Sequence, residues 1–227
     1  MTNTMIAVGA GVAVVAAVCW MFGATADESS KVGKLPAPTV ALKADQDAKP
    51  GQTRTAIFAG GCFWCVEGVY RQFRGVKDAT SGYSGGTKET ANYEDVCSHT
   101  TNHAEAVRIT YDPSVITYGQ LLQIFFSAHD PTTLDRQGND AGHNYRSAIF
   151  YQSDDERKVD EAYIKQLNDA KIFVDKIVTS LESLKAFYPA EDYHQDYVAS
   201  HPNEGYVRAC SLPKMQKVRE LYKDWLK

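Results

Sequence analysis

Two cysteines, Cys62 and Cys65, flank a Phe-Trp pair directly after two glycines, in the run Gly-Gly-Cys-Phe-Trp-Cys-Val-Glu at residues 60–67. The run follows a short apolar stretch, residues 55–59, and precedes apolar residues at helical spacing. A cysteine at the first turn of a helix faces unpaired amide hydrogens, which lower its pKa and favour the reactive thiolate. The glycines permit a sharp bend and leave the sulfur accessible. The cluster therefore indicates redox chemistry on an apolar or sulfur-bearing substrate.

Glu105 is the candidate acid. It lies in an alternating stretch, residues 104–111, that is predicted to be a strand. Alternation places Glu105 on the face shared with Val107 and Ile109, which is the apolar face. A carboxyl group there is partly desolvated, which favours its protonated form near neutral pH and suits it to donate a hydrogen bond or a proton. The pattern alone leaves open a strand-end glutamate that points into solvent.

Several blocks of the chain, taken with the cysteine motif, resemble one known family. The motif Gly61-Cys62-Phe63-Trp64 is similar to the signature of the A-type peptide methionine sulfoxide reductases. Further matching blocks fall in that family's order between about residues 54 and 200, so the resemblance is more specific than any single motif. These blocks lie at residues 82–86, 93–98, 103–105, 111–113, 129–131, 137–140, 145–148 and 190–195.

The resemblance implies a role for each residue of the motif. Cys62 would be the nucleophile that attacks the polarised sulfur of methionine sulfoxide. Phe63 and Trp64 would form the apolar wall that accepts the substrate's S-methyl group. Without a reactive cysteine beside them, the same two aromatic residues would be read as ordinary core packing at a helix start.

The resemblance also implies the groups that bind the sulfoxide oxygen. Glu105 matches the glutamate that polarises or protonates this oxygen. Tyr93 and Tyr145 occupy the positions of two hydroxyl groups that hydrogen-bond it, and Asp140 matches a polar residue near the substrate. The chain has 13 tyrosines, so only the motif context singles out these two.

After the attack, Cys62 would be left as a sulfenic acid, which a second thiol condenses to a disulfide. Cys65, one helical turn away, is the first candidate for this resolving thiol. Many family members have glycine at this position and use cysteines in a glycine-rich C-terminal tail. This chain ends instead in a charged helix, although Cys210 lies in the segment before it, so Cys210 remains the alternative. Cys97 is interpreted as structural.

The implied activity is reduction of the S epimer of methionine sulfoxide, free and in proteins, and so repair of oxidised proteins. Thioredoxin or a similar dithiol would supply the electrons to a monomeric enzyme without metal or organic cofactor. Two other interpretations use some of the same residues. A thioredoxin-like disulfide oxidoreductase would use Cys62 and Cys65 but leaves Glu105 without a role. A zinc-binding module would combine these cysteines with Cys97 and His99 or His103, but the spacing lacks a standard second half-site.

The elements that must position these residues alternate between helix and strand. We predict strands at residues 76–84, 104–111, 146–151, 177–180 and 185–188. We predict helices at residues 63–74, 118–129, 153–171, 192–200 and 214–226, with a capping box of Ser153 and Glu156 opening the third. This order predicts an α+β domain, a two-layer ferredoxin-like sandwich with helices packed on a mixed sheet.

The chain divides into three parts. Residues 1–26 carry no charged side chain and include 20 mostly small apolar residues at 5–24, which predicts a secretory signal peptide or a membrane anchor and hence an exported, periplasmic or otherwise extracytoplasmic protein. Residues 27–53 hold three of the eight prolines and no aromatic residue, which predicts a flexible linker. Residues 54–227 form the predicted catalytic domain. The net charge of −4 without a block of one sign argues against nucleic-acid binding.

Overall fold

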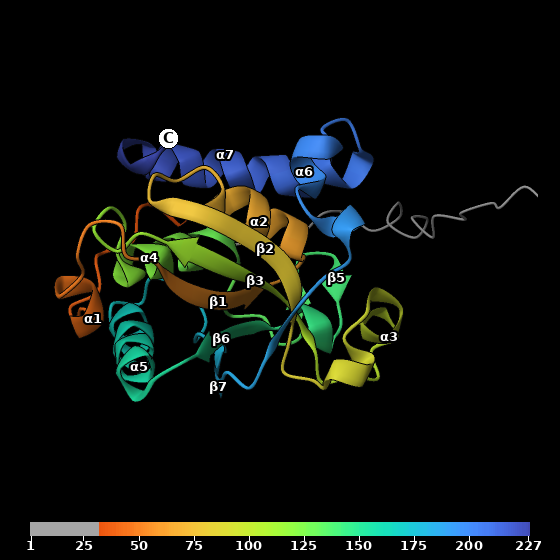
Figure 1. The fold of residues 1–227 in the computed structure, drawn as a ribbon, viewed down its shortest axis with the longest axis horizontal. Coiled ribbons are helices and arrows are strands. Elements are labelled where there is room, and N and C mark those ends of the chain that lie inside the picture. The colour runs from red at the N-terminus through yellow and green to blue at the C-terminus, as the bar shows by residue number, and fades with distance from the viewer. Residues whose placement is uncertain (1–31) are drawn as a thin grey trace, which may run out of the picture.

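A six-stranded sheet forms the centre of the computed structural model, which describes residues 32–227 (Figure 1). Its strand order is β7-β6-β1-β3-β2-β8, and every neighbouring pair is antiparallel except β6 and β7. The strands are β1 (Arg54–Gly60), β2 (Val76–Ser84), β3 (Ala104–Tyr111), β6 (Ser147–Tyr151), β7 (Ser180–Ser183) and β8 (Phe187–Pro189). A separate small ribbon pairs β4 (Arg136–Gln137) with β5 (Asp140–Ala141).

Four longer helices pack around this sheet, and Figure 1 shows α7 lying along α2 on the side of α2 away from the strands. They are α2 (Phe63–Tyr70), α4 (Tyr118–Ala128), α5 (Asp154–Asp169) and α7 (Leu212–Leu221). Shorter helices are α1 (Lys43–Gln46), α3 (Tyr93–Cys97) and α6 (Tyr197–Ser200), and single turns include η3 (His143–Tyr145), η4 (Asp192–His194), η6 (Lys223–Trp225) and the π-turn η5 (Val207–Ser211). The order β1-α2-β2-β3-α4-β6 across the sheet order β6-β1-β3-β2 is ferredoxin-like. The predicted α+β fold class is confirmed.

Alternation along the strands builds two apolar layers. In β1, Phe58 belongs to the main core beneath the helices, whereas its neighbour Ile57 belongs to a smaller cluster on the other face. The ring of Phe58 lies 5.0 Å from that of Phe125 on α4, centroid to centroid. In β3, Val107 and Ile109 join the main core. The helix-covered face of the sheet is therefore the face on which Glu105 was expected.

The predicted element boundaries hold well for the central strands and less well at the helix ends. The observed β2 and β3 match the predicted ranges, but α2 ends at Tyr70, and α3 was not predicted. At the start of α5, Glu156 N donates to Ser153 Oγ, while the Glu156 carboxylate accepts from Gln152 N instead of closing a capping box. A complete capping box opens α4 instead, between Thr117 and Gln120.

The segment before β1 packs against the domain, so the predicted flexible linker is wrong for residues 32–53. Leu35 and Leu42 are each only 3% exposed. Gln123 Nε2 donates to Leu35 O at 2.8 Å, and Tyr163 Oη donates to Pro36 O at 2.8 Å. The average hydrophobicity of the segment is low, but its two leucines are enough to bury part of it against the domain. Side chains of α4 and α5 hydrogen-bond its backbone carbonyl groups.

Asp45 completes the attachment of this segment, which we call the N-terminal strap (residues 32–53). Its carboxylate accepts from Tyr111 Oη at 3.1 Å and from Tyr118 N at the start of α4, and Arg54 Nε lies 3.6 Å away. The predicted signal peptide or anchor at residues 1–26 lies outside the described residues, as do residues 27–31. None of the helices in residues 32–227 is long and apolar enough to cross a membrane.

Candidate active site

The turn between β1 and α2 places Cys62 at the N-cap of α2. Gly61 has φ +88°, a left-handed conformation that favours glycine, and a Cβ atom there would lie 2.6 Å from Gln137 Cβ. A Cβ atom on Gly60 would lie 3.2 Å from the ring of His129. Gly61 is therefore required for the chain to turn closely over β4, and the narrow space beside His129 favours glycine at position 60. The turn presents Cys62, which is 6% exposed.

Glu105 lies beside this turn, on β3, and is 2% exposed. Phe63 N, the first amide of α2 and the one that follows Cys62, donates to Glu105 Oε2 at 3.1 Å, so the acid lies beside the nucleophile in space although the two are distant in the sequence. Burial raises the pKa of Glu105 to about 8, although the Phe63 hydrogen bond and the Asn144 side chain oppose the rise. The expected protonated carboxyl at neutral pH is thus a property of the folded site.

The two thiols of the motif form a buried, hydrogen-bonded pair. Burial, Cys65 and the Glu105 charge raise the pKa of Cys62, so the expectation that the helix terminus lowers it is wrong for the resting pair. The hydrogen bond from Cys62, with Lys214 and Ser211, lowers the pKa of Cys65 to about 6 despite burial. The two thiols share one negative charge, and this charge rests on Cys65 because more hydrogen-bond donors and positive charge point at Cys65 than at Cys62.

Phe63 and Trp64 line the site beside Cys62. Phe63 is 1% exposed, and its ring centroid lies 6.3 Å from that of Trp64. The indole of Trp64 stacks on Tyr197 of α6 at 3.7 Å with an angle of 6° between the rings. Trp64 Nε1 donates to His194 Nδ1 at 3.1 Å. The aromatic pair therefore forms a rigid apolar surface whose polar edge points away into η4.

The two predicted tyrosines come from α3 and η3. Tyr93 opens α3 and is 36% exposed, and its hydroxyl hydrogen-bonds the Cys97 thiol. Tyr145 is half-buried at the end of η3, and burial together with the charges of Glu105 and Cys62 raises its pKa. Both hydroxyl groups are therefore protonated donors at neutral pH.

Asp140 connects the site to the C-terminal segment. Tyr206 Oη donates to Asp140 Oδ2 at 2.5 Å, and burial raises the pKa of Asp140. The Cys65 thiol lies 4.0 Å from the same Tyr206 hydroxyl and 3.2 Å from Ser211 Oγ. The segment that carries Cys210 thus reaches the resolving position through Ser211, while Cys210 itself is half-buried and packs against the core.

Sequence reasoning missed four residues that the fold brings to this site. His194 accepts from Trp64, Tyr206 binds Asp140, Cys97 accepts from Tyr93, and Asn144 faces Glu105. His194 and Cys97 stand inside family-like blocks, which was a usable signal, but neither had an assigned chemical step. Tyr206 follows the last predicted block and carried no signal.

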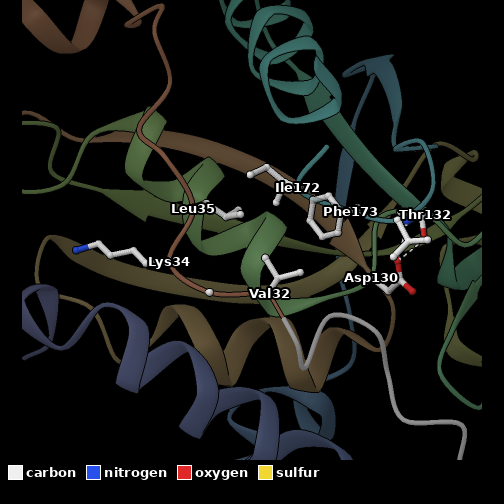
Figure 2. A pocket seen from close by; sticks show the side chains of 9 residues that line it. Val32, Lys34, Leu35, Asp130, Thr132, Ile172 and Phe173 are labelled. Carbon is white, nitrogen blue, oxygen red and sulfur yellow. Dashed lines mark hydrogen bonds between the residues drawn. The ribbon is translucent and has the colours of Figure 1, made fainter. Parts of the chain in front are cut away.

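Neither of two other features adds to this site. Among residues 32–227, no group of three or more histidine, cysteine and acidic side chains is arranged to hold a metal ion, so the residues of the zinc reading do not converge. A cavity of about 280 Å³ lies between the N-terminal strap and the loop that follows α5 (Figure 2). Its lining includes Leu35, Asp130, Ile172 and Phe173 and none of the predicted site residues.

The comparisons agree with this geometry. The family model described as peptide methionine sulfoxide reductase matches residues 54–226. The chain is 48% identical over 194 residues to peptide methionine sulfoxide reductase MsrA 2 of Synechocystis sp., across 85% of this chain and 90% of that protein. It is 51% identical over 179 residues to peptide methionine sulfoxide reductase MsrA 2 of Mesorhizobium japonicum, across 78% of this chain and 91% of that protein.

Solved structures give the same result. The reduced form of Mxr1 from Saccharomyces cerevisiae is 34% identical and superposes with a TM-score of 0.63, over 69% of this chain and 90% of that one. Methionine sulfoxide reductase A of Corynebacterium diphtheriae is 33% identical with a TM-score of 0.60, over 75% of this chain and 84% of that one. The sequence blocks, the fold and the arrangement around Cys62 all lead to the same assignment: this chain belongs to the peptide methionine sulfoxide reductase family.

Proposed function

We propose that this protein reduces the S epimer of methionine sulfoxide, free and within proteins, to methionine. The observation that carries the proposal is the buried Glu105 carboxyl, whose Oε2 lies 3.1 Å from Phe63 N, next to Cys62 at the N-cap of α2. A protonated acid beside a thiol and an apolar wall is what reduction of a sulfoxide requires. Disulfide exchange, the chemistry of the thioredoxin-like reading, breaks no sulfur–oxygen bond and so offers this acid no oxygen to protonate.

In the first step, Cys62 attacks the sulfoxide sulfur while Phe63 and Trp64 hold the methyl group. Glu105 donates a hydrogen bond or a proton to the sulfoxide oxygen, assisted by the hydroxyl groups of Tyr93 and Tyr145. The sulfur–oxygen bond of the substrate breaks, and the oxygen passes to Cys62 with one hydrogen. Where Glu105 supplies that hydrogen as a proton, the proton that the Cys62 thiol loses restores Glu105. The products are methionine and the Cys62 sulfenic acid, so the substrate sulfur gains the two electrons that Cys62 loses.

In the second step, Cys65 resolves the sulfenic acid. It is one helical turn from Cys62 and buried beside it. Its pKa is lowered to about 6 in the reduced pair, first by the hydrogen bond from Cys62, and the contributions of Lys214 and Ser211 do not depend on the Cys62 thiol and continue to favour the thiolate. The thiolate displaces the hydroxyl group of the sulfenic acid, which leaves as water after taking a proton, and a Cys62–Cys65 disulfide forms. Thioredoxin or a similar dithiol then reduces this disulfide, and its two electrons restore both thiols.

Export is a separate proposal, supported by the uncharged stretch at residues 1–26. An exported enzyme would repair oxidised methionine in extracytoplasmic proteins, acting as a monomer that is either released or held at the membrane by residues 5–24. Fractionation of cells that produce the full chain, followed by the intact mass of the recovered protein, tests this. Recovery of the uncleaved chain only in the cytoplasm would contradict export.

Single-turnover reduction of the two separate sulfoxide epimers tests the proposed function. We expect the S epimer alone to be reduced, and mass mapping of the product to show a disulfide between Cys62 and Cys65. The Cys65→Ser variant should stop after about one turnover per enzyme, because the sulfenic acid then has no resolving partner. Normal multiple turnover with thioredoxin in that variant would assign the resolving step to Cys210 or to direct reduction.

A further inference from the structure

Asn144 is a buried amide near Glu105 that takes part in none of the steps above. It is the middle residue of η3, between His143 and Tyr145, and is 2% exposed. The turn packs against β3, the strand that carries Glu105. The side-chain nitrogen of Asn144, Nδ2, is buried and has no hydrogen-bond partner among residues 32–227. Native proteins seldom leave a buried N–H unpaired, so this atom calls for a functional explanation.

His99 fixes the opposite end of the Asn144 amide. His99 Nδ1 lies 2.8 Å from Asn144 Oδ1. An amide oxygen can only accept, so Nδ1 carries a hydrogen and donates it. The neutral ring with its hydrogen on Nδ1 and the doubly protonated ring both have this donor, so protonation of His99 does not break the bond. Because Oδ1 is held in this way, the Nδ2 end of the amide faces away from His99.

The backbone at Gly142 and at His99 permits this contact. A Cβ atom on Gly142 would lie 2.5 Å from His99 Nδ1 and 2.7 Å from Asn144 Oδ1, so a side chain at this position would collide with both partners. His99 itself has φ +59°, a left-handed conformation that is uncommon for a residue with a side chain. Two unusual backbone positions thus bring an exposed imidazole against a buried amide.

Arg146 holds the turn that carries Asn144. Its Nε and Nη2 donate to the two carboxylate oxygens of Glu182 on β7, at 3.0 and 3.2 Å. Its Nη1 donates to His143 O at 3.1 Å. A guanidinium bound to a carboxylate at two points resists rotation. The Asn144 side chain therefore projects from a turn that is fixed to the edge of the sheet.

The N–H end of the Asn144 amide is the end that faces Glu105. Burial raises the pKa of Glu105 to about 8, and the Phe63 hydrogen bond and the Asn144 side chain oppose this rise. A hydrogen-bond donor favours the charged form of a carboxyl group, whereas a carbonyl oxygen would disfavour it. The unpaired hydrogen of Nδ2 is therefore directed at the group that changes its charge during the reaction.

The titratable groups that act on Glu105 are thiols, phenols and one carboxyl group. They lie on α2, α3, β2, β5 and η3 and are Cys62, Cys65, Cys97, Tyr83, Tyr93, Asp140 and Tyr145. None of these seven side chains can carry a positive charge. A Glu105 carboxylate must therefore be stabilised by neutral donors, of which Phe63 N already serves Oε2.

We propose that Asn144 is a positioning residue for the proton transfer from Glu105: its N–H, unpaired at rest, donates to the carboxylate that forms when the Glu105 proton passes to the sulfoxide oxygen. The proton that the Cys62 thiol loses then restores Glu105, and the hydrogen bond is released. A donor that gains a charged acceptor only as the proton moves stabilises the transition state more than the resting state. This inference rests on the proposed function, since it needs Glu105 to lose its proton during reduction.

Two substitutions remove either the donor or the group that orients it. Asn144→Leu keeps a similar shape and has no N–H, so we expect the maximal rate of single-turnover reduction of the S epimer to fall by about 10 to 100-fold at neutral pH. The half-saturating substrate concentration should change little. His99→Leu leaves the donor in place but frees the amide to rotate, so its loss should be smaller. An unchanged rate in Asn144→Leu overturns the inference.

The matched control for His99 is His143, a second exposed histidine in contact with an oxygen. Its Nδ1 lies 2.9 Å from Asp135 Oδ1, and it precedes Asn144 in the same turn. His143→Leu should leave the reduction rate unchanged. A loss as large as that of His99→Leu would show that any disturbance of η3 slows the reaction, and would overturn the assigned role.

A double substitution tests whether Asn144 acts through Glu105. The Glu105→Gln variant forms no carboxylate, so adding Asn144→Leu should slow its single-turnover reduction no further. Additive losses would show that Asn144 acts independently of the Glu105 proton and would contradict the proposal.

A titration without substrate measures the interaction directly. In protein labelled with carbon-13 at the glutamate carboxyl groups, the Glu105 signal is the one that Glu105→Gln lacks. Removing the donor disfavours the charged form, so the pKa of Glu105 should be higher in Asn144→Leu than in the wild type and unchanged in His143→Leu.

The surface variant His99→Leu should show a smaller rise in the pKa of Glu105, and it supplies the test if Asn144→Leu does not fold. No rise in either variant overturns the inference. Because the titration needs no turnover, it separates the two ideas: failure of the proposed function appears as a wild-type protein that does not reduce the sulfoxide, whatever the titration shows.

Discussion

Glu105 and Asp160 are two buried acids with very different surroundings. Glu105 on β3 is 2% exposed and Asp160 on α5 is fully buried, and burial raises the pKa of each to about 8. Both oxygens of Asp160 lie within hydrogen-bond distance of the Tyr118 hydroxyl, at 3.0 and 3.3 Å. Glu105 instead receives one backbone amide, from Phe63, and lies beside the Cys62 and Cys65 thiols.

The difference shows what a raised acid pKa indicates by itself. At Asp160 the shift reports only that a carboxyl group has been buried against a tyrosine, within reach of the charge of Glu156. At Glu105 the same shift occurs beside a nucleophile, a second thiol and an aromatic wall. A perturbed acid becomes a candidate for catalysis when a group that it can assist lies next to it.

The largest effect is expected from removing the Cys62 thiol, which is the group that Glu105 can assist. We expect Cys62→Ser to abolish turnover, because a serine hydroxyl is too weak a nucleophile to attack the sulfoxide sulfur and accept its oxygen. The measurement is methionine formed from the S epimer with excess dithiol. Turnover above the level of the enzyme-free control would remove Cys62 from the mechanism, and Glu105 would then be no better a candidate than Asp160.

The next largest effect should come from exchanging each acid for its amide. Glu105→Gln keeps a similar shape but cannot give a proton, so we expect the reductive step to slow by about 10² to 10⁴-fold at neutral pH. Asp160→Asn keeps an acceptor for Tyr118 and should leave that rate unchanged. Single-turnover kinetics measures both variants. Equal rates for wild type and Glu105→Gln would show that Glu105, like Asp160, takes no part in the reductive step.

The two acids should contribute in the same way to the pH dependence of the unfolding free energy. Each has a folded pKa near 8, well above the value of 4.5 for Glu105 or 3.8 for Asp160 in the unfolded chain. A raised pKa contributes stability below the unfolded value, and that contribution is lost as the pH rises to about 8. Each amide substitution should therefore lessen the fall in unfolding free energy between pH 5 and pH 8 by roughly 3 kcal/mol. Denaturation curves at the two pH values check this.

A third buried carboxyl, Asp45 of the N-terminal strap, should give the smallest effect. Its oxygens accept from Tyr111 Oη and Tyr118 N, and an amide could satisfy only part of this arrangement. We expect Asp45→Asn to lower the free energy of unfolding by about 1 kcal/mol with no change in kcat. A loss of kcat at constant stability would mean that the strap communicates with the active site.

Periodicity predicted the central strands and the face that carries Glu105, because alternation is strong where one side of a sheet is buried. The pKa values of the two thiols could not be predicted from the sequence. The Cys65 value depends on Ser211, 146 residues later in the chain, and on Lys214. His194 had no predicted role for the same reason, since its partner Trp64 lies 130 residues earlier.

The N-terminal strap was mispredicted because composition averages a segment, whereas packing depends on single residues. Two buried leucines and one aspartate help to attach it, and the hydrogen-bond partners of Leu35 and Asp45 lie on α4, on β3 and at Tyr222. The family model begins at residue 54, after the strap, so the resemblance offered no correction either.

The attachment of the strap has a consequence for the order of folding. Its contacts to Gln123, Tyr163 and Tyr222 join residues 88, 127 and 187 positions apart, although the strap leaves the ribosome before any of them. Closing such long loops is slow and comes after local structure has formed. Docking of the strap is therefore expected to be the final event, after α7 and η6, between which Tyr222 lies, have formed. Substitutions in it should speed unfolding while leaving the refolding rate unchanged.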